Sequence, residues 1–461
     1  MGQGADGAGQ GPHSGRDHCG RTGRRALGRI RAGHAAWPGA EQDSGHGAQL
    51  PHPGRGQQIR RRPVAPCPPA RRPVALGPAL PRLEAGLSTA AAKGPARQLL
   101  LLGAGHAHVQ VLAQMAQAPW TGAQITLIAP YDRQLYSGMV PGFVAGHYAL
   151  DDCVIPLQPL VQRSGIRWLQ RSVSALDAQA QTVQLDDGSV LHYDWLSINT
   201  GPVQNRALIE QSLPGAREHA LFIRPIEAFG ALWPQVVQMG QSRALRIAVV
   251  GAGAAGMELA MAMRHCLPGA AITLLCGDVP LGAGYNAGVQ AKLRAALLKR
   301  KITLLPDSAA GLRSGEILLA SGASLACDVP VLTVGAQAPA WLQPSGLALD
   351  AQGFVAVDAC QRSTSHAQVF AAGDVSSRVD RTLARSGVYA VRAGPALATN
   401  LAATLAGQLL LEHQPPQHTL NLISCGDHFA IASWGEHSAQ GRWVWWLKDW
   451  IDRRFLARYR L

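Results

Sequence analysis

One glycine-rich stretch, Leu245 to Ala262, constrains the fold of this chain more than any other part of it. It reads LRIAVVGAGAAGMELAMA: a short apolar run, a cluster of glycines, and then small residues that favour a helix. Gly251, Gly253 and Gly256 have the G-x-G-x-x-G spacing. The first glycine permits a tight turn, the second lets backbone N–H groups approach a pyrophosphate, and the third lets helix and strand pack closely. Because a helix N-terminus also supplies free N–H donors, the stretch predicts a strand, a turn and a helix that bind a dinucleotide.

A second stretch of the same kind lies nearer the start of the chain, with its first glycine 148 residues earlier. Residues 98–117, QLLLLGAGHAHVQVLAQMAQ, again predict a strand, a turn and a helix, with Gly103 and Gly105 at the first two positions. His108 stands where the third glycine is usual, so a side chain must be fitted there between helix and sheet. Glycine-rich turns between strands and helices are common, but two in one chain predict two dinucleotide sites.

The strands that follow the two turns lack the acid that usually binds a ribose hydroxyl group. Residues 124–129 complete a βαβ unit and end in Ala129, and residues 271–276 end in Cys276. Asp278 comes two residues later and is a candidate for the ribose contact. That placement favours NADH, and no Arg is placed to accept a 2′-phosphate.

An alternation of apolar and polar residues predicts a small antiparallel meander between the two stretches. Residues 166–201 alternate with a period of two, turn at Asp187-Gly188 and return to a strand that ends at Thr200-Gly201. The returning strand brings the chain back to the first dinucleotide half.

The third informative stretch, residues 366–377, delivers a carboxylate to the end of a strand. It reads HAQVFAAGDVSS, so Asp374 follows Gly373 at the carboxyl end, where doubly wound sheets bind ligands. Residues 329–339 predict another returning strand, with a glycine turn at Gly335. The overall pattern predicts an α/β fold with two Rossmann-like domains.

The basic charge of the chain is concentrated in its first 96 residues. They contain fourteen Lys and Arg against five Asp and Glu, so +9 of the net charge of +13 lies there. This Gly-, Pro- and Arg-rich segment cannot bury enough apolar surface to offset its chain entropy, so we expect disorder. It is interpreted as a transit peptide, as a basic tethering tail, or as sequence upstream of the true start, which we favour. The remaining charge of about +4 gives no reason to expect nucleic-acid binding.

Neither a metal site nor a redox-active dithiol is predicted. The eight cysteines include no C-x-x-C or C-x-x-x-x-C pair, which fits a reduced, cytoplasmic setting. His106 and His108 have no neighbouring Cys or carboxylate cluster, so a structural role beside the turn is favoured. No run of 18 apolar residues predicts a spanning helix.

The sequence leaves two interpretations open for each of two segments. Residues 131–148 form a glycine-punctuated loop that is either functional or a plain connection over the sheet. Residues 441–461 contain four of the eleven Trp and predict a basic amphipathic helix. This helix lies either in a membrane interface, as a peripheral contact on the inner face, or against its own domain or a dimer partner. The apolar side expected for it consists of Trp443, Val444, Leu447, Trp450, Ile451 and Phe455.

Together, the segments GAGHAHV, YSGMVPGFVAGHY, GAGAAGMELA, VFAAGDV and WWLKDWIDRRF give the chain a family resemblance. From Gln98 to Leu461 it resembles the FAD-dependent pyridine nucleotide-disulfide oxidoreductase superfamily. Within that superfamily it resembles the branch associated with selenide water dikinase, which is related to type II NADH dehydrogenases and sulfide:quinone reductases. Beyond the basic tail (1–96), the resemblance implies three parts: an FAD-binding domain in two pieces (97–223 and 350–407), an NAD(P)H-binding domain (224–349) and a C-terminal region (408–461).

The resemblance also implies the roles of single residues. Gly103, Gly105 and Asp374 would bind FAD, and Glu258 would lie near the contact between nicotinamide and flavin, unless it only complements the helix dipole. The other residues expected to bind cofactors are Gly251, Gly253 and Gly256 for NAD(P)H, and His106, Thr200, Gly201, Gly335 and Gly373 beside the turns.

The identity of the electron acceptor stays open between several hypotheses. With no dithiol, the chain is expected to pass electrons from NAD(P)H through FAD to a quinone or another small acceptor. However, Tyr389, Arg392 and Pro395 replace the glutamine-rich quinone motif of type II NADH dehydrogenases. The alternatives are a soluble reductase in selenium or sulfur metabolism and a flavoprotein without turnover that is a partner of selenophosphate synthesis.

Overall fold

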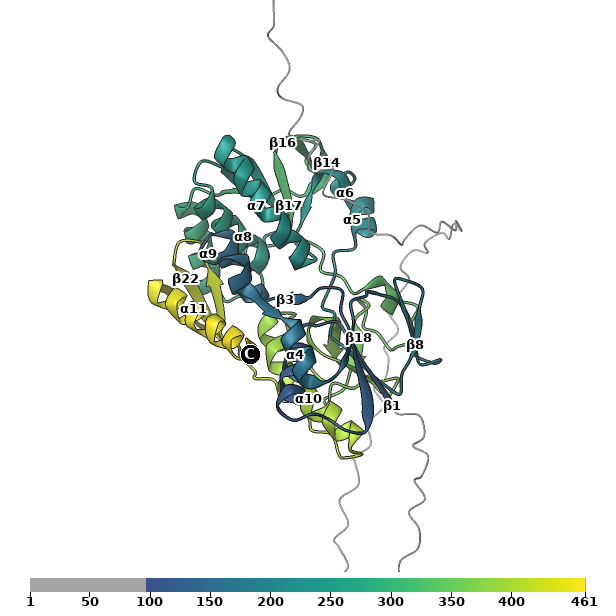
Figure 1. The fold of residues 1–461 in the computed structure, drawn as a ribbon. Coiled ribbons are helices and arrows are strands. Elements are labelled where there is room, and N and C mark those ends of the chain that lie inside the picture. Colours follow the sequence, from purple (N-terminus) through teal and green to yellow (C-terminus); the bar gives the residue numbers. More distant parts are fainter. Residues whose placement is uncertain (1–96, 461) are drawn as a thin grey trace, which may run out of the picture. The chain divides into compact units, whose positions relative to one another are not determined.

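Two five-stranded parallel sheets form the framework of residues 97–460, which are the residues that the computed structural model describes (Figure 1). In the first sheet the order is β19 (Val369–Ala371), β9 (Trp195–Ile198), β1 (Arg97–Leu102), β2 (Ala123–Ile128) and β5 (Arg167–Leu169). In the second it is β10 (Leu221–Phe222), β17 (Val329–Leu332), β11 (Arg246–Val250), β12 (Ala271–Leu275) and β13 (Thr303–Leu305). The chain therefore has the α/β fold with two Rossmann-like domains that its sequence predicts.

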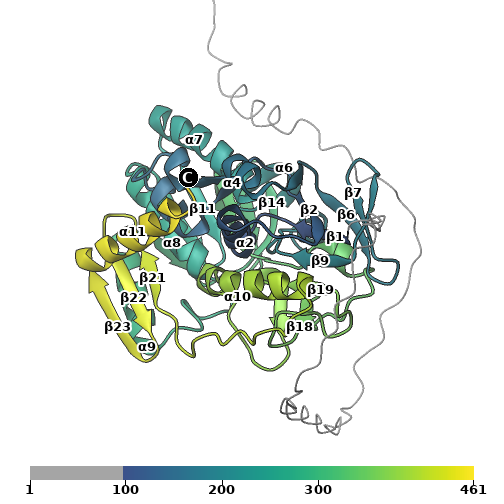
Figure 2. The same ribbon diagram turned by 60° about the horizontal axis from the view of Figure 1, so that its bottom comes forward.

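Helices cover the sheets because the central strands are apolar on both faces. In β1, the four leucines from Leu99 to Leu102 are all buried. The helices of the first half are α2 (His106–Gln117), α4 (Leu157–Ser164) and α10 (Gly387–Leu405), and α10 lies beside α2 (Figure 2). Those of the second half are α5 (Arg206–Ser212), α6 (Ala216–His219), α7 (Ile226–Ser242), α8 (Ala254–Cys266) and α9 (Ala287–Lys299).

Small sheets occupy the positions that the alternating segments predict. The meander consists of β6 (Val173–Asp177), β7 (Thr182–Leu185) and β8 (Val190–His192), with the Asp187-Gly188 turn between the last two strands. A matching meander in the second half consists of β14 (Ala309–Arg313), β15 (Glu316–Leu319) and β16 (Ser324–Ala326). The segment before the Gly373 turn adds η4 (Ala340–Leu342) and β18 (Val355–Val357), which pairs in parallel with β20 (Ser376–Arg378).

The segment 131–148 is not a bare loop. It contains β3 (Arg133–Leu135), η2 (Ser137–Met139) and α3 (Val140–Val144), and β3 pairs with β4 (Val154–Pro156) after the short helix η3 (Leu150–Cys153). Met139, Val140, Phe143 and Val144 are buried. The segment therefore belongs to the core between the two halves.

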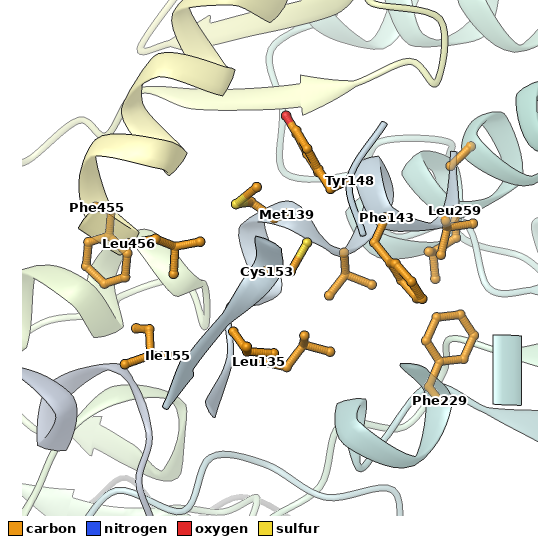
Figure 3. Close-up of a cluster of buried hydrophobic side chains, with 14 of the residues drawn as sticks. Leu135, Met139, Phe143, Tyr148, Cys153, Ile155, Phe229, Leu259, Phe455 and Leu456 are labelled. Carbon is orange, nitrogen blue, oxygen red and sulfur yellow. The ribbon is translucent and has the colours of Figure 1, made fainter. Parts of the chain in front are cut away.

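The C-terminal region is a three-stranded antiparallel sheet with one helix across it. Its elements are β21 (Asn421–Ser424), β22 (Ala430–Trp434), β23 (His437–Gly441) and α11 (Arg442–Ala457), which lies over the sheet (Figure 2). Phe455 and Leu456 of α11 join a buried cluster with Leu135 and Ile155 (Figure 3). The helix thus packs against its own chain.

The face that α11 buries differs from the apolar side that the sequence predicts. Lys448 and Asp452 lie on the buried face, where they form an ion pair, whereas Trp443, Trp450 and Ile451 are exposed. Val444 and Phe455 of the expected side are buried, but its other exposed members show that the buried face is rotated, because a paired and hydrogen-bonded charge can be buried while tryptophan stays at the surface. The residues of α11 that are buried are Val444, Asp452, Phe455 and Leu456.

The remaining predictions concern the basic tail, the cysteines, metal clusters and membrane-spanning helices. The basic tail, with Cys19 and Cys67, lies outside residues 97–460. Within those residues all six cysteines are free, and no cluster of three or more His, Cys, Asp or Glu has the geometry to hold a metal ion. None of the described helices is both long and apolar enough to cross a membrane.

Candidate functional site

The two glycine turns have the same backbone geometry at the carboxyl ends of equivalent strands. Gly103 and Gly251 both have positive φ, 83° and 109°, and each donates its N–H to the end of the neighbouring strand. These bonds run from Gly103 to the carbonyl of Ile128 at 2.8 Å and from Gly251 to that of Leu275 at 3.0 Å. Each turn leads directly into a helix, α2 or α8, with Gly105 or Gly253 at the N-cap.

At the first turn, the side chain of Asn199 caps the helix. Asn199 follows β9 and is 2 % exposed. Its Oδ1 accepts the backbone N–H groups of Ala107 and His108, both at 3.0 Å, and its Nδ2 donates to the carbonyl of Ala372 at 2.6 Å. Among the described residues, the N–H of His106 has no such partner. The first turn therefore offers a phosphate one free helical donor rather than three.

His108 occupies the place of the third glycine as a fully buried, neutral imidazole. Its Nδ1 lies 2.6 Å from the carbonyl oxygen of Gly103 and its Nε2 lies 2.8 Å from Oγ of Ser197. Burial lowers the pKa of His108 to about 4, despite its bond to Gly103. Because a carbonyl only accepts, Nδ1 carries the proton and Ser197 donates its hydroxyl proton to Nε2. The side chain is fitted between helix and sheet, as the sequence requires.

At the second turn, the helix N-terminus is left open. Thr333 follows β17 as Asn199 follows β9, but its hydroxyl donates to the carbonyls of Val250 at 2.8 Å and Gly251 at 3.0 Å, not to the helix. A Cβ added to Gly253 would meet nothing within 4 Å, whereas one added to Gly256 would overlap the carbonyl of Gly251. The second turn thus keeps the open approach for a phosphate and the close helix packing that its three glycines predict.

Beside the first turn lies a pair of partly buried charges without hydrogen-bond partners. Asp374 stands in η5 (Gly373–Val375), and burial raises its pKa, although Arg224 and Arg385 oppose the shift. Burial lowers the pKa of Arg224, while Asp374 and Glu227 act against that change. Within residues 97–460, neither the carboxylate of Asp374 nor the guanidinium of Arg224 has a hydrogen-bond partner. Partly buried groups of this kind can bind a polar ligand, and a dinucleotide with a diphosphate and ribityl hydroxyls is one.

The other predicted cofactor residues line the same edges. Thr200 and Gly201 directly follow Asn199, and Gly335 holds the equivalent place after Thr333, with φ of 71° and 72° at the two glycines. His106 begins α2, and its ring contacts Tyr136 edge-on, with centroids 5.4 Å apart. Burial, with a smaller effect of Arg224, lowers its pKa to about 4. His106 is therefore neutral beside the turn.

Glu258 lies one turn into α8, where it joins a network of titratable groups from α11. Its Oε1 accepts the N–H of Ser424 in β21 at 2.7 Å. Desolvation raises the pKa of Glu258 to about 7, against the opposing effects of Lys448 and the Ser424 N–H. Desolvation alone would lower the pKa of Lys448, but the carboxylates of Asp452 and Glu258 outweigh it and raise that pKa.

The network continues to the segment 131–148. Lys448 donates to Oδ2 of Asp452 and to the carbonyl of Gly138, both at 2.6 Å. Tyr136 donates its hydroxyl to Oδ1 of Asp452 at 3.2 Å and contacts the ring of His106. Polar side chains therefore connect α11 with the first residue of α2, and Glu258 of α8 interacts with them through its charge.

Four of these residues were not predicted from the sequence. Asn199 precedes the Thr200-Gly201 pair by one residue, so its place at the end of a returning strand was a usable signal. Lys448 and Asp452 have the i, i+4 spacing of a helical ion pair, which hydrophobicity alone ignored. Arg224 gave no signal, because nothing in its local sequence shows that the tertiary fold buries it.

Comparison with known proteins places these features in a wider context. The family model described as pyridine nucleotide-disulphide oxidoreductase matches residues 97–400. The chain is 29 % identical over 361 residues to the ferredoxin–NAD(+) reductase component of the anthranilate 1,2-dioxygenase system of Burkholderia cepacia. That match covers 73 % of this chain and 78 % of the relative.

Two further relatives match over shorter stretches. A demethylphylloquinone reductase of Synechocystis sp. is 29 % identical over 175 residues, with 35 % of this chain and 42 % of the relative covered. An NADH dehydrogenase-like protein of Mycobacterium tuberculosis is 27 % identical over 242 residues, with 50 % and 60 % covered. The chain thus spans about half the length of these two relatives.

Solved structures share the fold at low identity. The sulfide:quinone oxidoreductase of Aquifex aeolicus has a TM-score of 0.65 at 16 % identity, covering 79 % of this chain and 92 % of that one. The NDH2 of Plasmodium falciparum in complex with NADH has a TM-score of 0.65 at 12 % identity, covering 79 % and 97 %. At these identities the likeness concerns the fold.

Proposed function

We propose that this chain, which belongs to the pyridine nucleotide-disulphide oxidoreductase family, is an FAD-dependent NAD(P)H oxidoreductase whose electron acceptor is a quinone. One observation carries the proposal: Glu258 of α8, whose pKa is raised by desolvation, lies close enough to the Lys448–Asp452 ion pair of α11 for their charges to act on it. A quinone takes up two protons with its two electrons, so its reduction needs proton donors in a place sheltered from water.

We place the cofactors at the two turns. Arg224, Asp374 and the N–H of His106 would hold FAD at the first turn, and the open N-terminus of α8 with Gly251 and Gly253 would hold NAD(P)H at the second. When bound, FAD supplies the hydride chemistry by accepting two electrons from the nicotinamide and releasing them to the acceptor. The surrounding residues orient the rings, exclude water and hold protons. Thr200, Gly201, Gly335 and Gly373 shape the backbone beside the two ligands.

Glu258 is assigned the proton-donating role. With a pKa raised to about 7, its carboxyl is partly protonated at neutral pH, while Lys448, whose pKa is raised, stays charged nearby. The names of the relatives agree in kind with this proposal: one reduces demethylphylloquinone, and another, in Arabidopsis thaliana, is an alternative NAD(P)H-ubiquinone oxidoreductase.

Stopped-flow kinetics tests the proposal. The yellow protein should be bleached by NADH, and a soluble quinone should then restore the colour. We expect reoxidation to slow as the pH rises through about 7, and Glu258→Gln to slow it about tenfold or more and remove that dependence. Glu227→Gln is the matched control, because Glu227 is also a buried carboxyl with a raised pKa but hydrogen-bonds to Leu135, away from Lys448. A quinone that fails to reoxidise the reduced protein would refute the proposal.

The same experiment separates the alternative acceptors. Selenium and sulfur compounds, tested anaerobically, address the resemblance to the branch associated with selenide water dikinase. A small ferredoxin addresses the likeness to the Burkholderia relative. Reoxidation by one of these and not by quinone would reassign the acceptor while leaving the flavin reaction intact.

A second proposal concerns the place of the reaction: we propose that α11 docks the protein on a membrane surface. Trp443, Trp446 and Trp450 are each more than half exposed and recur at helical spacing on one face. Trp434 of β22 is exposed as well, and Arg442 begins the helix. Exposed tryptophans with basic neighbours are typical of helices that lie in a lipid interface, where a quinone is dissolved.

Vesicle co-sedimentation tests the docking. We expect the wild-type protein to bind vesicles of phosphatidylcholine and phosphatidylglycerol, and the triple change Trp443→Ser, Trp446→Ser and Trp450→Ser to reduce binding about tenfold or more. Leu409→Ser is the control, because Leu409 is 93 % exposed but lies outside α11. Equal binding by the triple variant and the wild type would rule the helix out as the docking surface.

A further inference from the structure

Asn199 connects four segments of the first turn. Its backbone N–H donates to the carbonyl of Leu102 at 2.8 Å, and its backbone carbonyl accepts the N–H of Gly105 at 3.1 Å. Its side chain receives two N–H groups from the start of α2 and donates to Ala372, directly before the Gly373-Asp374 turn. One buried carboxamide therefore sets the spacing between the helix N-terminus and the turn that carries Asp374.

A Cβ atom built on each of three glycines shows how closely the chain surrounds Asn199. A Cβ at Gly105 would lie 2.5 Å from Oδ1 of Asn199, and one at Gly373 would lie 2.9 Å from its Nδ2. A Cβ at Gly103 would lie 2.7 Å from its carbonyl oxygen. Real Cβ atoms do not approach that closely, so Asn199 itself accounts for part of the glycine pattern at the first turn.

The second turn provides the contrast. Thr333 has the equivalent place, since its N–H donates to the carbonyl of Val250 at 3.0 Å, as that of Asn199 donates to Leu102. Its hydroxyl leaves the start of α8 untouched. The carboxamide is therefore a special feature of the first turn and not a requirement of the strand-turn-helix backbone.

We propose that Asn199 is a positioning residue for FAD. It fixes the N–H of His106 and the turn that carries Asp374 in the arrangement that receives the diphosphate and ribityl groups, and it keeps the next two N–H groups from competing for them. A carboxamide suits the position, because one end of it accepts two N–H groups from α2 while the other end donates to Ala372. The inference rests on the proposed placement of FAD at the first turn, but not on the identity of the acceptor.

Titration of the apoprotein with FAD, followed by flavin fluorescence, tests the inference without any turnover. We expect Asn199→Ala to weaken FAD binding about tenfold, because it removes three hydrogen bonds that organise the site. Asn199→Asp should weaken it further at pH 8, because a carboxylate cannot donate to Ala372 and repels the diphosphate. Protonation restores the donor, so the affinity of Asn199→Asp should recover about tenfold toward pH 5, relative to the wild type, whereas Asn199→Ala should not recover.

Thr333→Val is the matched control at the equivalent place. We expect it to leave the FAD affinity within about twofold of the wild type. FAD binding by both Asn199 variants at the wild-type affinity would overturn the inference, as would equal weakening by Thr333→Val. Thermal unfolding of the apoproteins accompanies each titration. If Asn199→Ala does not fold, the pH-dependent recovery of the nearly isosteric Asn199→Asp decides alone, and a failure to recover overturns the inference.

Discussion

The two glycine turns have the same backbone geometry but different side-chain partners at the start of the helix that follows. At the first turn, Asn199 caps the helix and His108 fills the space beneath it. At the second, Thr333 turns away from the helix and Gly256 lets α8 approach the strand directly. The first turn is therefore organised by its own side chains, and the second leaves its helical donors for a ligand.

This difference matches the demands of two kinds of ligand. A resident cofactor gains from a site whose polar groups are already fixed, because less ordering is needed on binding. A nicotinamide cosubstrate must bind and leave in every cycle, which an open helix N-terminus permits. With FAD at the first turn and NAD(P)H at the second, as proposed above, these demands would explain why one fold within one chain uses the same turn with different side chains.

The largest loss of stability is expected when the first turn is made to resemble the second. His108→Gly would restore the third glycine of the pattern, yet we expect it to lower the free energy of unfolding by about 3–5 kcal/mol. The change leaves a cavity in place of a fully buried ring and removes the partner of Ser197. Urea denaturation measures the loss.

Gln114→Gly on the exposed side of the same helix is the control for that change. It reports the loss of helix propensity alone, about 1 kcal/mol. If His108→Gly were no more destabilising than this control, the imidazole would have no packing role and the comparison between the turns would fail.

A somewhat smaller effect should appear as acid sensitivity of the first turn. Burial lowers the pKa of His108 from 6.5 to about 4 in the folded chain, so the unfolded chain binds its proton first. The resulting stability is present above pH 6.5 and is lost as the pH falls toward 4, by about 3 kcal/mol. Between pH 6.5 and pH 4 we expect the free energy of unfolding to fall about 3 kcal/mol less in His108→Gln than in the wild type. Parallel pH profiles of the two proteins would contradict the assignment of this sensitivity to His108.

The sequence predicted the parts of this site whose chemistry is local. Strand, turn and helix at both turns follow from apolar runs and glycine spacing, and Asp374 was found because it ends a strand. Asn199, Arg224 and Lys448 were missed because their roles depend on neighbours that are distant in sequence. Asn199 and Ala372 are 173 residues apart, and Lys448 and Gly138 are 310 apart. Hydrophobic periodicity likewise misplaced the buried face of α11, since it cannot foresee that a lysine and an aspartate will be paired inside.

The smallest effect tests the roles of two glycines within the second turn. Gly256→Ala would drive a Cβ into the carbonyl of Gly251 and to 2.8 Å from Oγ1 of Thr333, so we expect a loss of about 1–3 kcal/mol in the free energy of unfolding. Gly253→Ala meets no atom within 4 Å, and the φ of Gly253 is −69°, so its stability should stay within about 0.5 kcal/mol of the wild type.

NADH binding should be affected more directly by Gly253→Ala than by Gly256→Ala, which is the opposite of their order in stability. The methyl group of Gly253→Ala lies in the open approach to the helix N-terminus, so we expect the KM for NADH to rise about tenfold while the protein stays folded and yellow. Gly256→Ala acts through packing of α8, and its effect on KM should follow its loss of stability. If Gly253→Ala bound NADH as the wild type does, the open space above the second turn would not be the nicotinamide dinucleotide's approach. The contrast between an open turn and a filled one would then be a difference of packing alone.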